Sequence, residues 1–147
     1  MIIAGFGPGG RALADRLGIM GVSYSIVELN AATVTRQARL GRRVVFGDAS
    51  NAEVLETAGL SEADAVIVTI PDDQATLRAI QVARQAAPDV FIGARMQFLS
   101  GKVPALSLGA DEGTVVEVAT AVALEKELLG ALSKWMEKRE RGAASGA

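Results

Sequence analysis

The sequence predicts an α/β fold, a doubly wound parallel sheet covered by helices, in a chain of 147 residues. Two observations lead to this prediction. Short β-branched runs alternate with longer segments of helical period, which is typical of parallel strands joined by helices. The first run, Ile2 to Ala4, leads directly into a Gly-rich turn and then an Ala/Leu-rich segment, as in a βαβ unit. We therefore expect one open sheet rather than a helical bundle.

The strands and helices follow one another along most of the chain. Asn51 is expected to cap the third helix, and Gly59 follows it at the position that favours a left-handed residue. Pro88 ends the fourth helix, and Gly113 interrupts the last strand, which is therefore expected to be weak. Strands are predicted at residues 2–4, 24–27, 44–46, 65–69, 90–94 and 112–115, and helices at 11–17, 32–40, 51–58, 73–87 and 116–139. A Rossmann-like strand order of 3-2-1-4-5-6 is expected.

Three regions are predicted: a nucleotide-binding domain at 1–115, a C-terminal crossover or dimerisation helix at 116–140, and a disordered tail at 141–147. A helix from Val116 to Arg139 would be roughly 36 Å long, more than the ~30 Å of a small domain, so part of it is expected to project. Two alternatives remain open for this helix. It packs on its own sheet, or its distal half buries Trp135 and Met136 against a second copy.

Composition excludes several classes of function. The chain has no histidine and no cysteine, which removes the commonest general base, thiolate nucleophiles and most metal sites. A net charge of −2 gives no electrostatic footprint for nucleic acid. No apolar run approaches the roughly 18 residues of a membrane span, and the N-terminus lacks a signal-like basic region. A cytoplasmic protein is expected.

The Gly-x-Gly-x-x-Gly turn is the first candidate binding site. Gly5 permits the tight turn, Gly7 lets backbone amides approach a pyrophosphate, and Gly10 lets the helix pack close to the strand. The run also includes Phe6, Pro8 and Gly9. Its place between a strand and a helix favours nucleotide binding over an ordinary turn.

An acidic residue supports the same interpretation. Glu28 ends the second strand 18 residues beyond Gly10, close to the spacing at which a carboxylate binds the adenosine ribose hydroxyls. Leu29 follows it, and no arginine stands nearby for a 2′-phosphate. NAD(H) or an adenine nucleotide is therefore favoured over NADP.

The turns after the other strands add candidates, each with a structural alternative. Asp48, with Ala49, is placed to accept from the adenine amine, although a Gly-Asp pair also makes ordinary turns. The segment Thr69, Ile70 and Pro71 leaves the fourth strand beside the phosphate site, before Asp72 and Asp73, which favour a helix start. Arg95 is expected to face the crevice at the end of the fifth strand, or to be solvated.

The combined motifs resemble one family along almost the whole chain. They are the Gly-rich turn, Glu28, Gly47-Asp48-Ala49, Val54-Leu55 with Ala58-Gly59, Asp64 to Ile67, Ala94-Arg95, and Leu108 to Glu112. This set is similar to that of the regulator-of-potassium-conductance (RCK) or TrkA N-terminal domain, especially the version attached to Kef-type cation:proton antiporters. The resemblance implies a homodimer formed through the C-terminal helix, binding of NAD(H) or AMP/ADP, and gating of a membrane-embedded potassium transporter, channel or antiporter at the inner face of the membrane.

Two departures from the family pattern are visible. Pro8 stands where many relatives carry an arginine that aids phosphate binding, and Gly113-Thr114 replaces an apolar pair in the sixth strand. The prediction is a regulatory domain and not an enzyme. Two alternatives stay open: the cofactor domain of an NAD-dependent oxidoreductase, although no Tyr-x-x-x-Lys pair is present, and a nucleotide-free dimerisation module.

Overall fold

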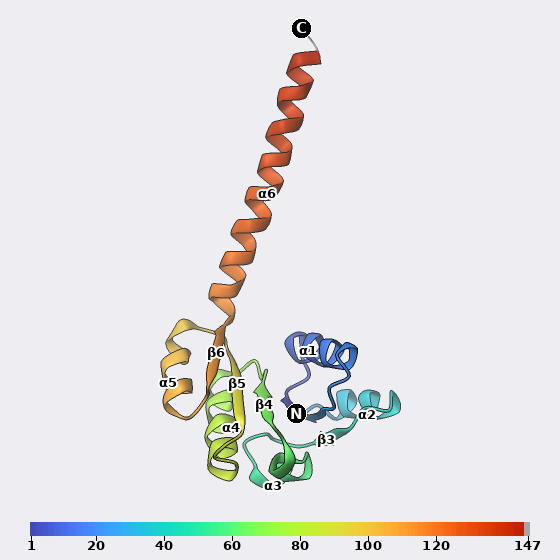
Figure 1. The fold of residues 1–147 in the computed structure, drawn as a ribbon, viewed down its shortest axis with the longest axis vertical. Helices are drawn as coiled ribbons and strands as arrows, with labels where there is room; N and C mark the ends of the chain where they lie inside the picture. Colours follow the sequence, from blue (N-terminus) through green and yellow to red (C-terminus); the bar gives the residue numbers. More distant parts are fainter. Residues whose placement is uncertain (146–147) are drawn as a thin grey trace.

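The predicted architecture is confirmed by a computed structural model, which describes residues 1–145. Six parallel strands form one sheet in the order β3-β2-β1-β4-β5-β6 (Figure 1). The strands are β1 (Ile2–Ala4), β2 (Ser25–Glu28), β3 (Val44–Phe46), β4 (Ala65–Val68), β5 (Phe91–Met96) and β6 (Glu112–Val115). The point between β1 and β4, where the strand order reverses, is where open α/β sheets bind their ligands.

Helices cover the sheet on two faces. They are α1 (Pro8–Ile19), α2 (Ala31–Arg39), α3 (Ala52–Thr57), α4 (Asp73–Ala86), α5 (Lys102–Ser107) and α6 (Val116–Ser145), with 3-10 turns at Leu60–Glu62 and Leu99–Gly101. Successive strand residues point to opposite faces. Ile3 packs with Phe6 and Ala14 on the α1 side, whereas Ile2 and Ala4 join the larger core on the other side.

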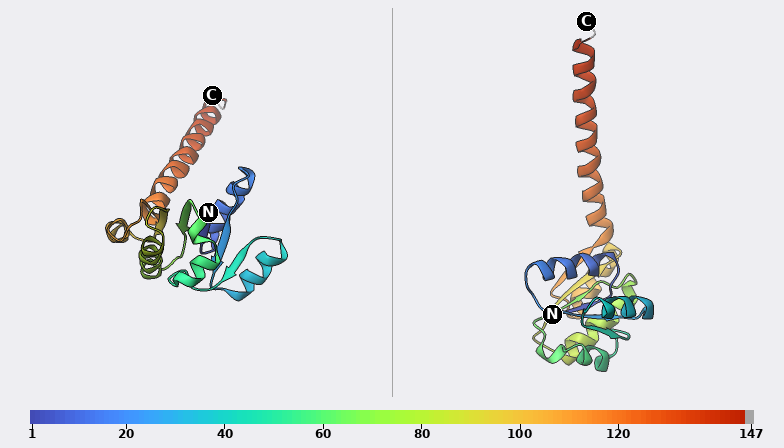
Figure 2. Two further views of the ribbon diagram at one scale, coloured as in Figure 1. Left: turned by 60° about the horizontal axis from the view of Figure 1, so that its bottom comes forward. Right: turned by 90° about the vertical axis from the view of Figure 1, so that its right-hand side faces the viewer.

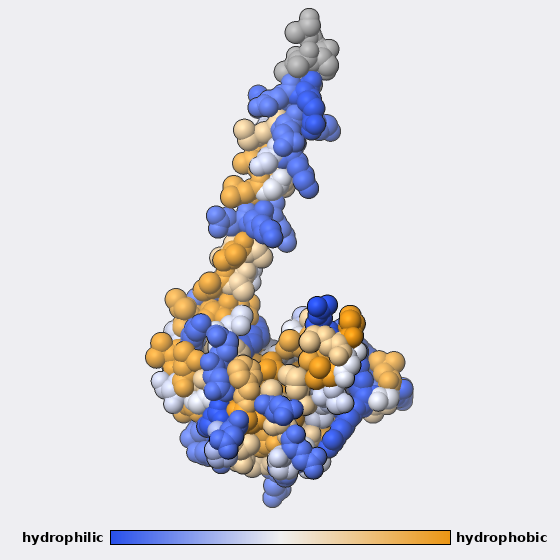
Figure 3. Space-filling model, viewed as in Figure 1, coloured by the Kyte–Doolittle hydropathy of each residue, from blue (hydrophilic) through white to orange (hydrophobic). Residues whose placement is uncertain are grey.

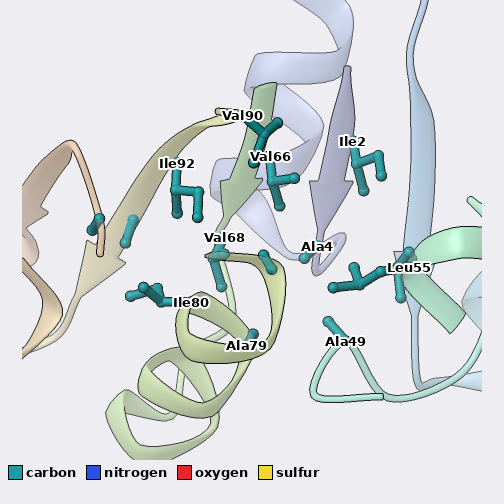
Figure 4. Packing of buried hydrophobic residues seen from close by; sticks show 14 of the residues in the cluster. Ile2, Ala4, Ala49, Leu55, Val66, Val68, Ala79, Ile80, Val90 and Ile92 are labelled. Carbon is teal, nitrogen blue, oxygen red and sulfur yellow. The ribbon is translucent and has the colours of Figure 1, made fainter. Parts of the chain in front are cut away.

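The larger core joins the sheet to α3, α4 and α5. Each of the three helices contributes a residue that is no more than 1% exposed: Leu55, Ile80 and Ala105. Figure 4 shows Ile80 and Ala79 of α4 against Val68 and Ile92 of the central strands. This packing fixes α4, and with it the loop that enters α4 from β4.

Local signals placed most helix ends correctly. Asn51 caps α3 by accepting from the Glu53 N–H at 2.8 Å, and Gly59 is left-handed with φ +94°, both as predicted. Asn30 caps α2 in the same way through the Thr33 N–H. These caps satisfy backbone donors that have no partner inside the helix.

The structure differs from the predicted elements in several places. The short helix α5 and the 3-10 turn before it were not predicted, because Gly101 and Pro104 are residues that usually argue against a helix and α5 has only six residues. Pro104 is tolerated because it lies in the first turn, where backbone amides have no helical partner. The predicted weak strand β6 pairs with β5 over its whole length, from Glu112 to Val115.

The C-terminal helix is longer than predicted. Helix α6 runs to Ser145, so residues 141–145 of the predicted tail are helical, while residues 146 and 147 lie outside the described residues. Figures 1 and 2 show α6 projecting away from the domain beyond β6. It does not pack along its own sheet, which removes that alternative.

An apolar stripe follows the projecting helix (Figure 3). Its large apolar side chains are 46% to 60% exposed: Val118, Val122, Leu124, Leu128, Leu129, Leu132, Trp135 and Met136. None of the helices in the described range combines the length and apolar character of a membrane span.

Candidate functional site

A cleft of about 590 Å³ opens at the carboxyl ends of β1 to β4. This is a common size for the pocket of a small organic ligand. Its walls come from the Gly-rich turn, the end of β2, the turn after β3 and the β4–α4 loop. The lining residues are Gly5, Phe6, Gly7, Arg11, Val27, Glu28, Leu29, Thr33, Gly47, Asp48, Ala49, Ile70, Pro71, Asp72, Ala75 and Arg78.

The Gly-rich turn is held tightly between β1, β2 and β4. Gly5 has φ +95°, and its N–H donates to the Val27 carbonyl at 2.8 Å. A Cβ on Gly10 would lie 2.2 Å from the Gly5 carbonyl oxygen, so only glycine lets α1 approach this closely. The Thr69 hydroxyl donates to the Gly5 carbonyl at 2.8 Å from the β4 side. Gly10 and Thr69 therefore shape the turn from behind the cleft.

The N-terminus of α1 faces the cleft through this turn. Pro8 is its first residue, and no side chain caps its first turn. The first amides of a helix have no intrahelical partner and attract anions. Arg11 donates its Nε to the Phe6 carbonyl at 3.2 Å, which brings a positive charge to the same end of the cleft. This end is suited to a phosphate group.

Glu28 connects the Gly-rich turn to the end of β2. Its Oε2 accepts from the Phe6 N–H at 2.8 Å, and its Oε1 accepts from the Asn30 N–H at 2.7 Å. A carboxylate has about four acceptor positions, so two remain for ribose hydroxyls. The Phe6 ring itself is buried in the α1 core at 2% exposure, so Phe6 offers the cleft its backbone rather than its ring.

Asp48 lies in the turn after β3. Its Oδ1 accepts from the Ser50 N–H at 2.8 Å. Hydrogen bonds from the Ser50 backbone and hydroxyl, with a smaller contribution from the charge of Arg78, lower the pKa of Asp48. Asp48 is therefore an ionised acceptor at neutral pH, as recognition of an exocyclic amine requires.

The β4–α4 loop joins the cleft to the root of α6. Asp72 caps α4 through the Ala75 N–H at 2.7 Å, while Asp73 accepts from the Gln97 N–H at 2.6 Å. Glu117 at the start of α6 accepts from the Leu99 N–H at 3.0 Å, and its own N–H donates to the Gln97 carbonyl. A continuous set of hydrogen bonds thus runs from the cleft wall to α6.

Nine of the predicted site residues line the cleft together. They are Gly5, Phe6, Gly7, Glu28, Leu29, Asp48, Ala49, Ile70 and Pro71. Pro8, Gly9, Gly10 and Thr69 are not among the lining residues, and Gly10 and Thr69 act on the turn instead.

Arg95 differs most from its expected position. It lies inside β5, which continues to Met96, and not at the end of the strand. Its guanidinium donates to the Ile70 carbonyl at 3.3 Å and to Gln97, and it lines a second groove with Leu13 and Thr114. It therefore supports the β4–α4 loop from outside the cleft.

The sequence-based interpretation missed part of the lining. The lining residues that were not among the predicted site residues are Arg11, Val27, Thr33, Gly47, Asp72, Ala75 and Arg78. Ala75 and Arg78 are three residues apart on α4 and share one helix face. The spacing predicts that they share a face, but nothing in the sequence indicates that this face meets the cleft.

Comparison with known proteins agrees with this geometry. The chain is similar to K(+) efflux antiporter 3, chloroplastic, of Arabidopsis thaliana, with 31% identity over 137 residues, which are 88% of this chain. The chain spans 18% of the length of that antiporter.

Two solved structures are similar over most of the chain. The TrkA-N domain of inner membrane protein ybaL from Escherichia coli has a TM-score of 0.82 and 26% identity, covering 86% of this chain and 94% of that one. Shewanella denitrificans Kef CTD in its AMP-bound form has a TM-score of 0.78 and 27% identity, covering 89% and 79%.

The model of the TrkA-N domain matches residues 1–115, the range of the sheet and its covering helices. The resemblance to the TrkA N-terminal or RCK family is thereby confirmed. With the strand order, the Gly-rich turn and Glu28 in the expected arrangement, the chain belongs to the TrkA-N domain family.

Proposed function

We propose that this chain is a nucleotide-sensing regulatory domain that binds AMP/ADP or NAD(H) in the cleft and gates a potassium transporter, channel or cation:proton antiporter. The observation that carries the proposal is the order of groups in one cleft. The uncapped N-terminus of α1 with Arg11, then Glu28, then Asp48 provide sites for phosphate, ribose and base in the order in which an adenine nucleotide joins them. The AMP-bound form of the similar Kef CTD supports an adenine nucleotide.

The transport partner is proposed from the relatives. A potassium efflux antiporter and an inner membrane protein carry similar domains. The chain would then act at the inner face of a membrane, on a partner that it does not itself contain. No catalytic step is proposed in the cleft, and its acidic residues are assigned to binding.

The hydrogen bonds between the cleft and α6 support a switching mechanism. A nucleotide that contacts Ile70 to Asp72 changes the environment of Asp73, which is bonded to Gln97, whose carbonyl is bonded to Glu117. A ligand shifts such an equilibrium only by its difference in affinity for the two states. Couplings of about 1–3 kcal/mol are typical.

The apolar stripe of α6 supports a homodimer. Exposed apolar patches of this kind mark interfaces, and a parallel or antiparallel pair of α6 helices would bury Leu132 and Trp135. The two domains of the dimer would then report their ligand state through one shared helical element.

The first experiment is thermal unfolding with AMP, ADP, NAD, NADH and NADPH, followed by calorimetric titration of each ligand that stabilises the domain. A ligand at 100 times its Kd is expected to add about 2.7 kcal/mol to the free energy of unfolding. No stabilisation by any of these ligands would favour a nucleotide-free dimerisation module.

Glu28 provides the sharper test, because it also holds the Gly-rich turn. Glu28→Gln is titrated with AMP and with 2′-deoxy-AMP. If Glu28 binds the ribose, the wild-type preference for AMP disappears in the variant, whereas a purely structural role weakens both ligands equally. An unchanged preference would remove Glu28 from ribose recognition.

A further inference from the structure

Arg78 is the cation of the cleft that the proposed function leaves unassigned. It lies on α4 with its side chain exposed, and it lines the cleft together with Ala75 and Asp72. Within residues 1–145 it forms no ion pair and donates no hydrogen bond to a side chain or carbonyl. Arg11, at the other end, is already held by the Phe6 carbonyl.

The core places Arg78 beside Asp48. Ala49 and Ala79 are both buried in the larger core cluster, Ala49 in the turn after β3 and Ala79 on α4 (Figure 4). The residues that precede them in the sequence, Asp48 and Arg78, both line the cleft, and the charge of Arg78 acts on Asp48 without a contact within ion-pair distance. Within residues 1–145 the two side chains border the same cleft and are not joined in an ion pair.

Asp48 lies at the end of the cleft away from the proposed phosphate site. Gly7 and Arg11 belong to the β1–α1 end, and Glu28 ends β2, whereas Asp48 follows β3, two strands from β1. An ionised Asp48 repels a phosphate but accepts from an amine. The neighbouring arginine thus meets the base rather than a phosphate.

We propose that Arg78 is a base-recognition residue, whose guanidinium plane packs on the face of the adenine while Asp48 accepts from the exocyclic amine. This inference rests on the proposed nucleotide-binding function. A guanidinium is planar and lies flat on an aromatic ring, whereas a lysine ammonium has no plane and keeps only the electrostatic attraction to the ring. Leu29, exposed on the β2 side of the cleft, covers the base from another wall.

The test separates the base from the phosphate. Arg78→Ala, Arg78→Lys and the matched control Arg11→Ala are titrated with AMP, adenosine and ribose 5-phosphate, using two-dimensional NMR of the labelled protein to measure Kd values into the millimolar range. Because Arg78 is exposed, its replacement leaves the fold intact, and the spectra without ligand check this.

Arg78→Ala is expected to raise the Kd values for AMP and adenosine by about 3- to 30-fold, the range of a cation–π contact, and to change the Kd for ribose 5-phosphate by less than about twofold. Arg78→Lys is expected to lose most of the same affinity, because it keeps the charge but not the plane. Arg11→Ala is expected to weaken AMP and ribose 5-phosphate and to leave adenosine unchanged.

Two results would overturn the inference. Equal weakening of AMP and ribose 5-phosphate in Arg78→Ala would make Arg78 a phosphate ligand, and unchanged AMP affinity would make it a solvated surface residue. Either result leaves the proposed function intact. A wild-type protein that binds none of AMP, ADP, NAD and NADH would instead contradict the proposed function itself.

Discussion

The two halves of the sheet differ in how completely the chain covers them. On the α1 side, Ile3 of β1 and Ile26 of β2 are 0% exposed. On the same face of the other half, Phe91 of β5 is 45% exposed, and a groove of about 440 Å³ runs past Arg95 and Thr114 to Val116, the first residue of α6. The nucleotide half is complete in itself, whereas the β4–β6 half and α6 share an unfilled apolar surface.

This difference in coverage indicates which part of the chain needs a second molecule to bury its apolar surface. One chain supplies the Gly-rich turn, Glu28, Asp48 and the β4–α4 loop to the cleft. The stripe on α6 has no counterpart within residues 1–145. The proposed ligand binding is thus expected in the monomer, and the proposed gating response only in a dimer or a complex with the transporter.

The largest expected effect is on the nucleotide half. Gly10→Val would place a side chain against the Gly5 carbonyl, where even a Cβ comes within 2.2 Å. The domain is expected to lose about 3 kcal/mol of unfolding free energy, because the clash is with backbone. Urea unfolding followed by circular dichroism measures it.

The matched control is the neighbouring Gly9→Ala. A Cβ there lies 3.9 Å from Thr69, an ordinary contact, so a change within about 1 kcal/mol is expected. Equal losses of unfolding free energy in the two variants would show that the helix itself, and not the close approach of Gly10 to the Gly5 carbonyl, requires glycine.

The next effect concerns the edge of the β4–β6 half. Arg84 of α4 donates to the carbonyls of Pro88, Val90 and Gly109 and pairs with Asp111 at 2.7 Å. Arg84→Met is expected to cost about 2 kcal/mol, since it leaves these acceptors without a charged donor. Hydrogen exchange should then rise first in β6, and uniform exchange across the sheet would contradict a local role.

The double variant Leu132→Lys with Trp135→Lys is expected to have a smaller effect on the stability of the domain but to prevent the proposed dimer from forming. The pair is expected to abolish the dimer and to change the unfolding free energy of the domain by less than about 0.5 kcal/mol, because these side chains contact no part of it. Sedimentation equilibrium measures the mass. Lys138→Ala is the control, and a wild-type protein that stays monomeric would remove α6 as the interface.

The smallest effect is a pH dependence at Asp48. The pKa of Asp48 is lower in the folded protein than in the unfolded chain. Its ionisation therefore stabilises the fold at pH values above the unfolded pKa, and this contribution is lost as the pH falls through the folded pKa. Asp48→Asn is expected to remove this part of the acid sensitivity. Melting temperatures of both proteins against pH measure it, and identical slopes below pH 4 would contradict the expectation.

The sequence was sufficient for the fold because local signals agreed with one another. Asn51, Gly59 and Pro88 each have one dominant structural use, and the apolar run at 65–68 favours a strand buried on both faces. The short α5 was missed because Pro104 normally argues against a helix, and only the position of a proline within the first turn makes it acceptable.

The site was predictable where residues follow strands directly and not where they lie on a helix. Glu28 was predicted from its spacing to the Gly-rich turn, and Asp48 from its place in the turn that follows the third strand. Arg78 was not, because the packing of Ala49 and Ala79, which no sequence spacing records, brings it to the cleft. Arg95 was misplaced for a similar reason, since β5 continues two residues past its predicted end.

The thirty residues of α6 make it a lever of about 45 Å. The first turn of α6 is bound through Glu117 to Leu99, and the neighbouring Gln97 is bound to Asp73 at the start of α4. A shift of the β4–α4 loop would therefore be passed to the first turn of α6. A tilt of about 5° at the root would carry the far end through about 4 Å, given the helical rise per residue. At Trp135, nineteen residues from the start of the helix, the same tilt would give a displacement of about 2.5 Å, so a small change beside the cleft would become a larger movement where another molecule meets this side chain.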